Sequence, residues 1–127
     1  MCIRDSLEGV ADRVEVRTAD MREVPFPDGT FDTVVSNVAI HNLYQPAERQ
    51  RAIAEIARVL KPGGWALIND IRHGGEYAAA FAKHGCPDVR CLNSRWASLA
   101  ATLFTFGSLR PATLLAHKPS ATSSASI

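Results

Sequence analysis

The segment from residue 31 to residue 71 constrains the fold more than any other part of the chain. A dense apolar run over 31–40 predicts a strand covered on both faces, as in a parallel sheet. A helix begins at Pro46; one side carries Ala52, Ile53, Ile56, Ala57, Val59 and Leu60, and the other mostly Arg49, Arg51, Glu55 and Arg58. Lys61-Pro62-Gly63-Gly64 ends that helix, because proline cannot continue it and Pro-Gly suits a type II turn. A second buried strand over 65–71 completes a strand–helix–strand crossover, which is typical of α/β folds.

Weaker patterns on both sides of this crossover predict further elements. Apolar and polar residues alternate over 14–19, which predicts a strand. After the crossover we expect an alanine-rich helix over 75–84, a short strand over 89–92 and a final strand over 112–117. Residues 96–106 are apolar without clear periodicity and fit either a helix or a buried loop.

The composition excludes several classes of protein. The net charge of +1 gives no electrostatic basis for nucleic acid or an anionic membrane as the main partner. No apolar run approaches the roughly 20 residues that span a bilayer, and residues 1–6 lack the apolar core of a secretory signal. Three cysteines at irregular spacings favour reduced thiols over a disulfide framework or a zinc site. We therefore expect a cytoplasmic protein without a metal.

Three motifs follow one another in an informative order and spacing. Asp20-Met21 follows the expected strand over 14–19, Phe31-Asp32 opens the next strand as Phe-Asp-x-Val-x-Ser, and Arg58-Val59-Leu60-Lys61-Pro62-Gly63-Gly64 precedes a third. Together they resemble the class I S-adenosylmethionine-dependent methyltransferases over about residues 12–119, with the closest similarity to the small-molecule branch that includes ubiquinone/menaquinone-biosynthesis-like enzymes. The resemblance implies methyl transfer from S-adenosylmethionine to a small molecule, on a Rossmann-like doubly wound α/β sheet with an antiparallel C-terminal strand.

The sequence departs from this family in its N-terminal half. The family begins with a strand and a glycine-rich loop against the cofactor, and its second strand ends in an acid that holds the ribose. No Gly-x-Gly occurs in this chain. The resemblance therefore implies a partial domain that lacks the first two strands and is inactive alone, with residues 1–6 as a non-native leader, 7–119 as the partial domain and 120–127 as a disordered tail.

Loss of the first two strands has a consequence for the sheet. The family's strand order is 3-2-1-4-5-7-6, so the expected strand over 14–19 has no neighbour here. The strand that contains Thr33 has an open apolar edge, which is a template for association. We therefore expect marginal stability or self-association through that edge.

The resemblance also assigns residues to the cofactor. Asp20 matches the acidic position that accepts the adenine amino group, Met21 would pack near the adenine, and Asn37 lies where the methionyl part passes. Each has a structural alternative: Asp20-x-x-Glu23 also fits a helix capping box, Met21 fits plain core, and Asn37 fits a turn.

His41, Arg72 and His73 follow the ends of two expected strands and would face the substrate. A base is needed only where the methyl acceptor loses a proton, and an imidazole could accept it. Arg72 and His73 could recognise an acidic acceptor. A packed His41 and an exposed basic pair are the structural alternatives, while Asp70 is expected to cap or orient a loop and Trp65 to lie in the core.

Two other functions are compatible with the pattern. One is a different nucleotide-binding Rossmann-type enzyme, such as a dehydrogenase, without its glycine-rich loop. The motif set between Phe31 and Gly64 argues against it. The other is a non-catalytic interaction domain that uses the exposed sheet edge to bind a partner.

Overall fold

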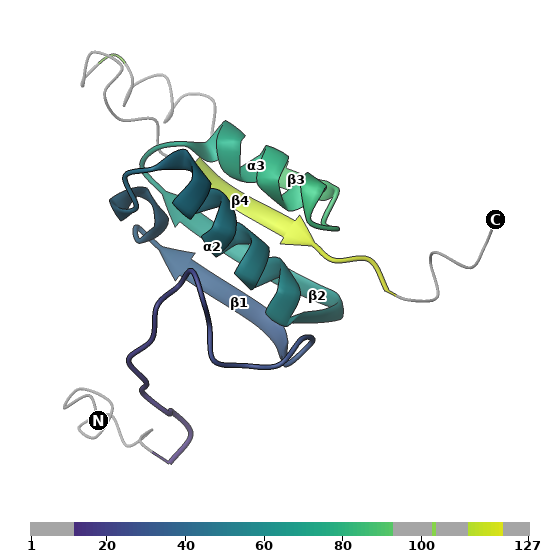
Figure 1. Cartoon of the computed structure of the whole chain (residues 1–127). Coiled ribbons are helices and arrows are strands. Elements are labelled where there is room, and N and C mark those ends of the chain that lie inside the picture. Colours follow the sequence, from purple (N-terminus) through teal and green to yellow (C-terminus); the bar gives the residue numbers. More distant parts are fainter. Residues whose placement is uncertain (1–11, 93–102, 104–111, 121–127) are drawn as a thin grey trace.

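The computed structural model describes residues 12–92, 103 and 112–120. In this part of the chain an open four-stranded sheet carries two helices on one face (Figure 1). The elements in chain order are β1 (Phe31–Asn37), the 3-10 helix η1 (Ile40–Asn42), α2 (Pro46–Val59), β2 (Leu60–Asp70), α3 (Gly74–Lys83), β3 (Asp88–Cys91) and β4 (Ala112–His117).

The strands lie in the order β1-β2-β4-β3. β1 and β2 are parallel, and β4 runs antiparallel to both β2 and β3. A parallel pair needs a crossover connection, which α2 supplies. The predicted α/β class, the strand–helix–strand crossover and the antiparallel final strand are confirmed. The order also matches the last four strands, 4-5-7-6, that the resemblance implies.

The junction between α2 and β2 differs from the expectation in one respect. Gly63 has a φ of +84°, as the central position of a Pro-Gly turn requires. β2 nevertheless begins at Leu60 and not at Trp65, because the turn is itself paired: Gly63 N donates to Lys118 O and Lys118 N donates to Gly64 O. The register between β1 and β2 shifts at this point, between Phe31 and Thr33.

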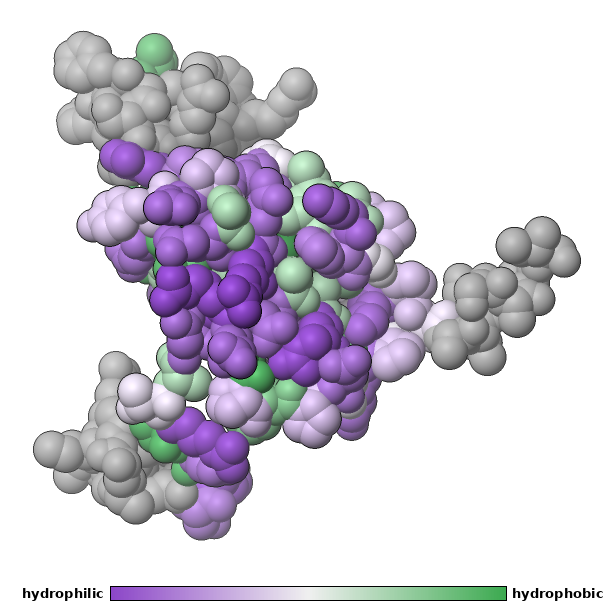
Figure 2. Space-filling model, viewed as in Figure 1, coloured by the Kyte–Doolittle hydropathy of each residue, from purple (hydrophilic) through white to green (hydrophobic). Residues whose placement is uncertain are grey.

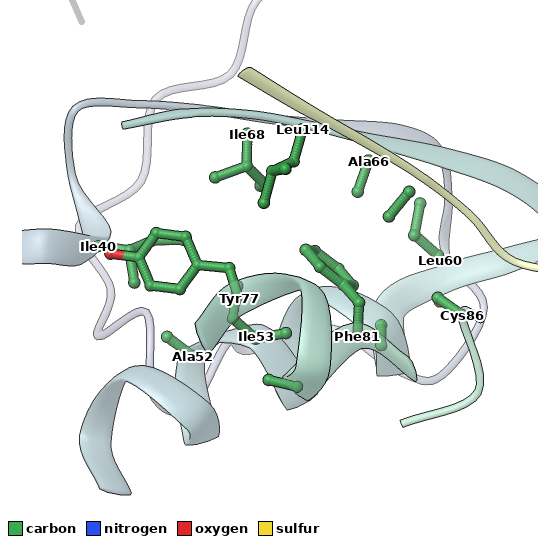
Figure 3. Close-up of a cluster of buried hydrophobic side chains, with 13 residues drawn as sticks. Ile40, Ala52, Ile53, Leu60, Ala66, Ile68, Tyr77, Phe81, Cys86 and Leu114 are labelled. Atoms are coloured by element: carbon green, nitrogen blue, oxygen red, sulfur yellow. The ribbon is translucent and has the colours of Figure 1, made fainter. Parts of the chain in front are cut away.

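A hydrophobic cluster of the described residues lies between the sheet and the two helices. Its buried members are Ile40, Ala52, Ile53, Ala57, Leu60, Ala66, Ile68, Tyr77, Ala80, Phe81, Cys86, Leu114 and Ala116. Figure 3 shows Tyr77 and Phe81 projecting from α3 toward the sheet. The outward side of α2 and α3 is mostly hydrophilic (Figure 2). None of the described helices is long and apolar enough to cross a membrane.

Two side chains do not lie where the helical and strand patterns place them. Arg49 was expected on the polar side of α2 but is only 5% exposed, because it donates hydrogen bonds to Glu76 and to two backbone carbonyls. Trp65 was expected in the core, but it is only partly buried, and its ring packs against His117 with centroids 4.2 Å apart. The strand alternation turns Ala66 and Ile68 toward the helices, and Trp65 away from them.

The prediction of a strand over 14–19 is wrong. Those residues have no regular structure, and Val14 and Val16 are 44% and 56% exposed. A strand needs a neighbour for its backbone groups, and no described strand pairs with this segment. Asp20 and Glu23 form an isolated bridge in a turn, so the capping-box alternative, which requires a helix, is wrong as well.

α3, β3 and β4 agree within one or two residues with the expected helix over 75–84 and the expected strands over 89–92 and 112–117. β1 ends at Asn37, three residues before the end of the expected run over 31–40. The prediction that this strand is covered on both faces is wrong, because α2 and α3 lie on one face of the sheet and Val35 is 64% exposed. Predictions for residues 1–6, for nearly all of 96–106 and for 121–127 lie outside the described residues.

Candidate functional site

A pocket lies where the two parallel strands end. β1 and β2 point the same way, so the segments after Asn37 and Asp70 meet at one edge of the sheet. An open pocket of about 460 Å³ lies there, lined by His41, Asn42, Tyr44, Pro46, Arg49, Ile71, Arg72 and His73. The three residues expected to face the substrate are thus brought together from two separate loops.

His41 contacts a buried carboxylate at the back of this pocket. Its Nδ1 lies 2.6 Å from Asp70 Oδ1, and the side chain of Asp70 is only 2% exposed. Nδ1 of His41 is itself buried, and no described residue accepts a well-aligned hydrogen bond from it. The His41 side chain as a whole is 18% exposed, so its exposed surface belongs to side-chain atoms other than Nδ1.

Asp70 is held by donors from three directions. His41 N donates to Oδ2 over 3.0 Å, Ile71 N donates to Oδ1 over 2.8 Å, and the Tyr77 hydroxyl donates to Oδ2 over 3.2 Å. Asp70 therefore orients both loops at the pocket, which confirms the loop-orienting role. Burial, and then the Asp70 carboxylate, raise the pKa of Tyr77 well above its usual value, so the phenol stays a donor.

An ion pair between Arg49 and Glu76 lies beside the pocket, and Arg49 is part of the pocket lining. Arg49 Nε and Nη2 lie 3.0 and 3.1 Å from the two carboxylate oxygens of Glu76, and Nη1 donates to the carbonyls of Leu43 and Tyr44. His73 Nδ1 lies 3.4 Å from Glu76 Oε2. This bidentate pair joins α2 to α3 and holds the loop before α2 in place.

The backbone is strained on both sides of the pocket. Val38, just after β1, has a φ of +49°, and His73, just before α3, has a φ of +64°. Left-handed backbone costs of the order of 1–3 kcal/mol for such residues, and strained residues cluster at active sites and ligand clamps. The hydrogen bond from Val38 N to Asn69 O, 2.7 Å long, helps to hold the first of these conformations.

The three residues assigned to the cofactor are not gathered into one pocket among the described residues. Asp20 is exposed and lines a separate open pocket of about 430 Å³ with Arg22, Glu23, Ala47, Glu48 and Arg51. Met21 is 36% exposed, so the core alternative does not hold. The Asn37 side chain accepts a hydrogen bond of 2.8 Å from Asn69 Nδ2 on β2.

Asp20 is ionised at neutral pH. Hydrogen bonds from the side chain of Arg22, and then from its backbone N–H, lower the pKa of the carboxyl to about 2. Arg22 also reaches Glu48 on α2, with Nη1 2.8 Å from Oε1. Asp20 is therefore a charged hydrogen-bond acceptor at the surface, already engaged by one guanidinium.

The sequence patterns do not predict the contact of His41 with Asp70 or the contact of Tyr77 with Asp70. One signal was available: Ala66, Ile68 and Asp70 alternate along one strand, so all three share the face that packs on the helices. A carboxylate at such a position needs donors.

A comparison of the sequence with models of known protein families agrees with the motifs. The model of a methyltransferase domain matches residues 2–68, which is more than half of the chain. The chain belongs to this methyltransferase family. The methyltransferase domain is 40% identical over 67 residues to a ubiquinone/menaquinone biosynthesis C-methyltransferase, UbiE, of Geobacter sulfurreducens. That alignment covers 51% of this chain and 25% of the relative, so the matched region spans about a quarter of the relative's length.

Solved structures share the fold at lower identity. The methyltransferase domain superimposes on a geranyl diphosphate methyltransferase in complex with S-adenosylmethionine with a TM-score of 0.66 at 18% identity, covering 91% of this chain and 62% of that one. The [4+2]-cyclase SpnF gives a TM-score of 0.69 at 21% identity, with 92% and 60% covered. These likenesses establish the fold alone, and the cyclase illustrates that one fold hosts different reactions.

Proposed function

We propose that this chain is the C-terminal part of an S-adenosylmethionine-dependent methyltransferase that acts on a small molecule. One observation supports the proposed substrate site. His41, Arg72 and His73 converge from two loops on one open pocket at the carboxyl edge of the parallel strands. Ligands of open α/β sheets bind at that edge. Arg72 and His73 give the pocket a basic wall, which favours an acceptor that carries an acidic group.

Asp20, Met21 and Asn37 have side chains of the right chemistry to contact parts of S-adenosylmethionine. Asp20 is an exposed, ionised carboxylate, which suits the amino group of adenine, and Met21 beside it offers an exposed apolar surface. Asn37 offers an amide at the end of β1. When bound, S-adenosylmethionine supplies an electrophilic methyl group. We further propose that Asp20, Met21 and Asn37 contact it and that the chain alone does not turn it over, because no Gly-x-Gly loop occurs in the sequence.

A binding experiment tests the cofactor. The N-terminal part of the Geobacter relative, fused ahead of this chain, is intended to supply the two strands and the glycine-rich loop that the resemblance implies. We expect this chimera to bind S-adenosylhomocysteine in calorimetry and not NAD. Asp20→Asn should weaken that binding by about 10-fold or more, since hydrogen bonds to charged groups contribute about 1.5–3 kcal/mol. The control is Asp32→Asn, a carboxylate whose side chain is 87% exposed.

Two outcomes would contradict these proposals. Preference of the chimera for NAD would favour the dehydrogenase alternative. Turnover of S-adenosylmethionine by the 127-residue chain alone, with any acceptor, would show that the chain holds a complete cofactor site. The interaction-domain alternative requires a stable complex without any affinity for the cofactor.

A further inference from the structure

We infer that Asp70 and His41 form a proton-accepting pair, in which Asp70 is the positioning residue that leaves Nε2 of His41 free to take a proton from the methyl acceptor. This inference rests on the proposed function, because it assigns roles within the same pocket. It is carried by the arrangement of the buried carboxylate, the ring and the pocket.

Several donors hold the Asp70 carboxylate in place. Both oxygens of Asp70 accept backbone hydrogen bonds, Oδ1 from Ile71 and Oδ2 from His41, so the group cannot rotate freely. The Tyr77 hydroxyl adds a third donor to Oδ2. The carboxylate is therefore fixed before any ligand arrives, as a preorganised site requires.

The contact with Asp70 favours one tautomer of His41. A neutral imidazole carries its proton on one nitrogen only. Nδ1 is buried 2.6 Å from Asp70 Oδ1, and two lone-pair atoms so close would repel each other. The carboxylate therefore favours the proton on Nδ1, and the lone pair is left on Nε2, at the opposite edge of the ring.

Nε2 lies on the opposite edge of the ring from the buried Nδ1. The ring lines the pocket with Arg72 and His73, while its Nδ1 edge is buried. Under this inference Nε2, on the side of the ring away from Asp70, is the nitrogen that faces the pocket. An acceptor bound against Arg72 and His73 then donates its O–H or N–H to this nitrogen.

The proton balance is simple. The acceptor's O–H or N–H bond breaks, and the proton moves to Nε2 of His41. An electron pair on the acceptor's oxygen or nitrogen forms the new bond to the methyl carbon. The electrons of the methyl–sulfur bond stay on the sulfur. His41 then carries a positive charge next to the Asp70 carboxylate, which stabilises it. An acceptor without an acidic proton would not need this pair.

The tautomer can be measured on the 127-residue chain itself. Long-range proton–nitrogen NMR spectra of the chain labelled with ¹⁵N-histidine, recorded at alkaline pH, distinguish a protonated from an unprotonated ring nitrogen. We expect His41 to carry its proton on Nδ1, whereas exposed His84 serves as the internal reference. A proton on Nε2 of His41 would overturn the inference.

Two variants separate positioning from simple support of the fold. Asp70→Asn should move the His41 proton toward Nε2, and Tyr77→Phe, which removes only one donor to Asp70, should leave it on Nδ1. If Asp70→Asn does not fold, the spectra of the unchanged chain and of Tyr77→Phe still show which nitrogen of His41 carries the proton. An unchanged tautomer in a folded Asp70→Asn variant would contradict the role of Asp70.

Activity gives the second readout. In an active chimera His41→Gln should lower kcat by about 10²–10⁴-fold with little change in KM, as expected for loss of a general base. His84→Gln is the matched control. An unaffected kcat would overturn the base role. A chimera without cofactor affinity would instead contradict the proposed function, while the tautomer of His41 would still be measured.

Discussion

At the scale of single residues, arginine–carboxylate contacts tie the loop before β1 to α2. Glu55 on α2 accepts hydrogen bonds from both Arg58 Nε and Nη2, at 2.8 and 2.9 Å, and from Val24 N at 2.8 Å. Arg58 in turn donates to the carbonyls of Phe26 and Val24. The loop is thus fastened to the helix by one carboxylate and one guanidinium. Because these donors favour the ionised form, they lower the pKa of Glu55, with Arg58 as the largest cause.

This shift predicts how stability depends on pH. A carboxyl whose pKa is lower in the folded state stabilises the fold above its unfolded pKa, and the contribution is lost as the pH falls through the folded value. We expect the free energy of unfolding to decrease below about pH 4.5, the ordinary value for Glu55. In urea unfolding at pH 7 and pH 3, Glu55→Gln should show a smaller difference than the unchanged chain. Asp32→Asn should behave like the unchanged chain, and equal acid dependence of all three would contradict the prediction.

At the scale of elements, the turn that joins α2 to β2 depends on a close backbone approach. A Cβ at Gly64 would lie 2.8 Å from Lys61 O and 2.9 Å from Asp32 O. Both are backbone atoms, so they cannot move aside as a flexible side chain could. Gly64 therefore lets β1 and the start of β2 come together, which explains why the sequence has two successive glycines here.

Gly64→Ala should destabilise the chain by about 1–3 kcal/mol, the usual cost of overpacking. Gly75→Ala is the matched control, since a Cβ there meets nothing within 4 Å and the residue lies in α3. Alanine in a helix is favoured over glycine by about 0.5–1 kcal/mol, so this variant should be slightly more stable. Urea midpoints measure both effects. Equal stability of Gly64→Ala and the unchanged chain would show that the turn tolerates a side chain.

The same elements indicate how far the sequence could predict the structure. Local signals found α2, α3, β3 and β4, because helix faces, proline and glycine act within a few residues. Pairing is not local: residues 14–19 have a strand pattern but no described neighbour to bond. Burial of polar groups is not local either. Arg49 is buried because Glu76 lies opposite it on another helix, and the contact of His41 with Asp70 joins residues 29 positions apart.

At the scale of the whole molecule, β1 is an edge strand of the described sheet. Val35 in its middle is 64% exposed, so an apolar side chain lies beside unpaired backbone groups. Natural sheets commonly protect such edges with charge, often a lysine. This edge has no such protection at Val35, which supports the expectation of self-association.

Sedimentation velocity over a range of concentrations tests that expectation. We expect the unchanged chain to associate as its concentration rises, and Val35→Lys to shift it toward the monomer. Ala79→Lys adds the same charge at an exposed position on α3 and should leave association unchanged. A chain that stays monomeric at every concentration would refute the prediction, as would equal behaviour of the two lysine variants.

The antiparallel course of β4 has a practical consequence. Ala112 pairs with Asp70 beside the pocket, whereas His117 pairs with Trp65 at the opposite edge of the sheet. The chain therefore leaves the sheet on the side away from His41, Arg72 and His73 (Figure 1). A tag, dye or sensor surface attached at residues 118–120, directly after β4, starts from that far side. Ligand screening on the immobilised protein can then proceed with the pocket directed toward the solution.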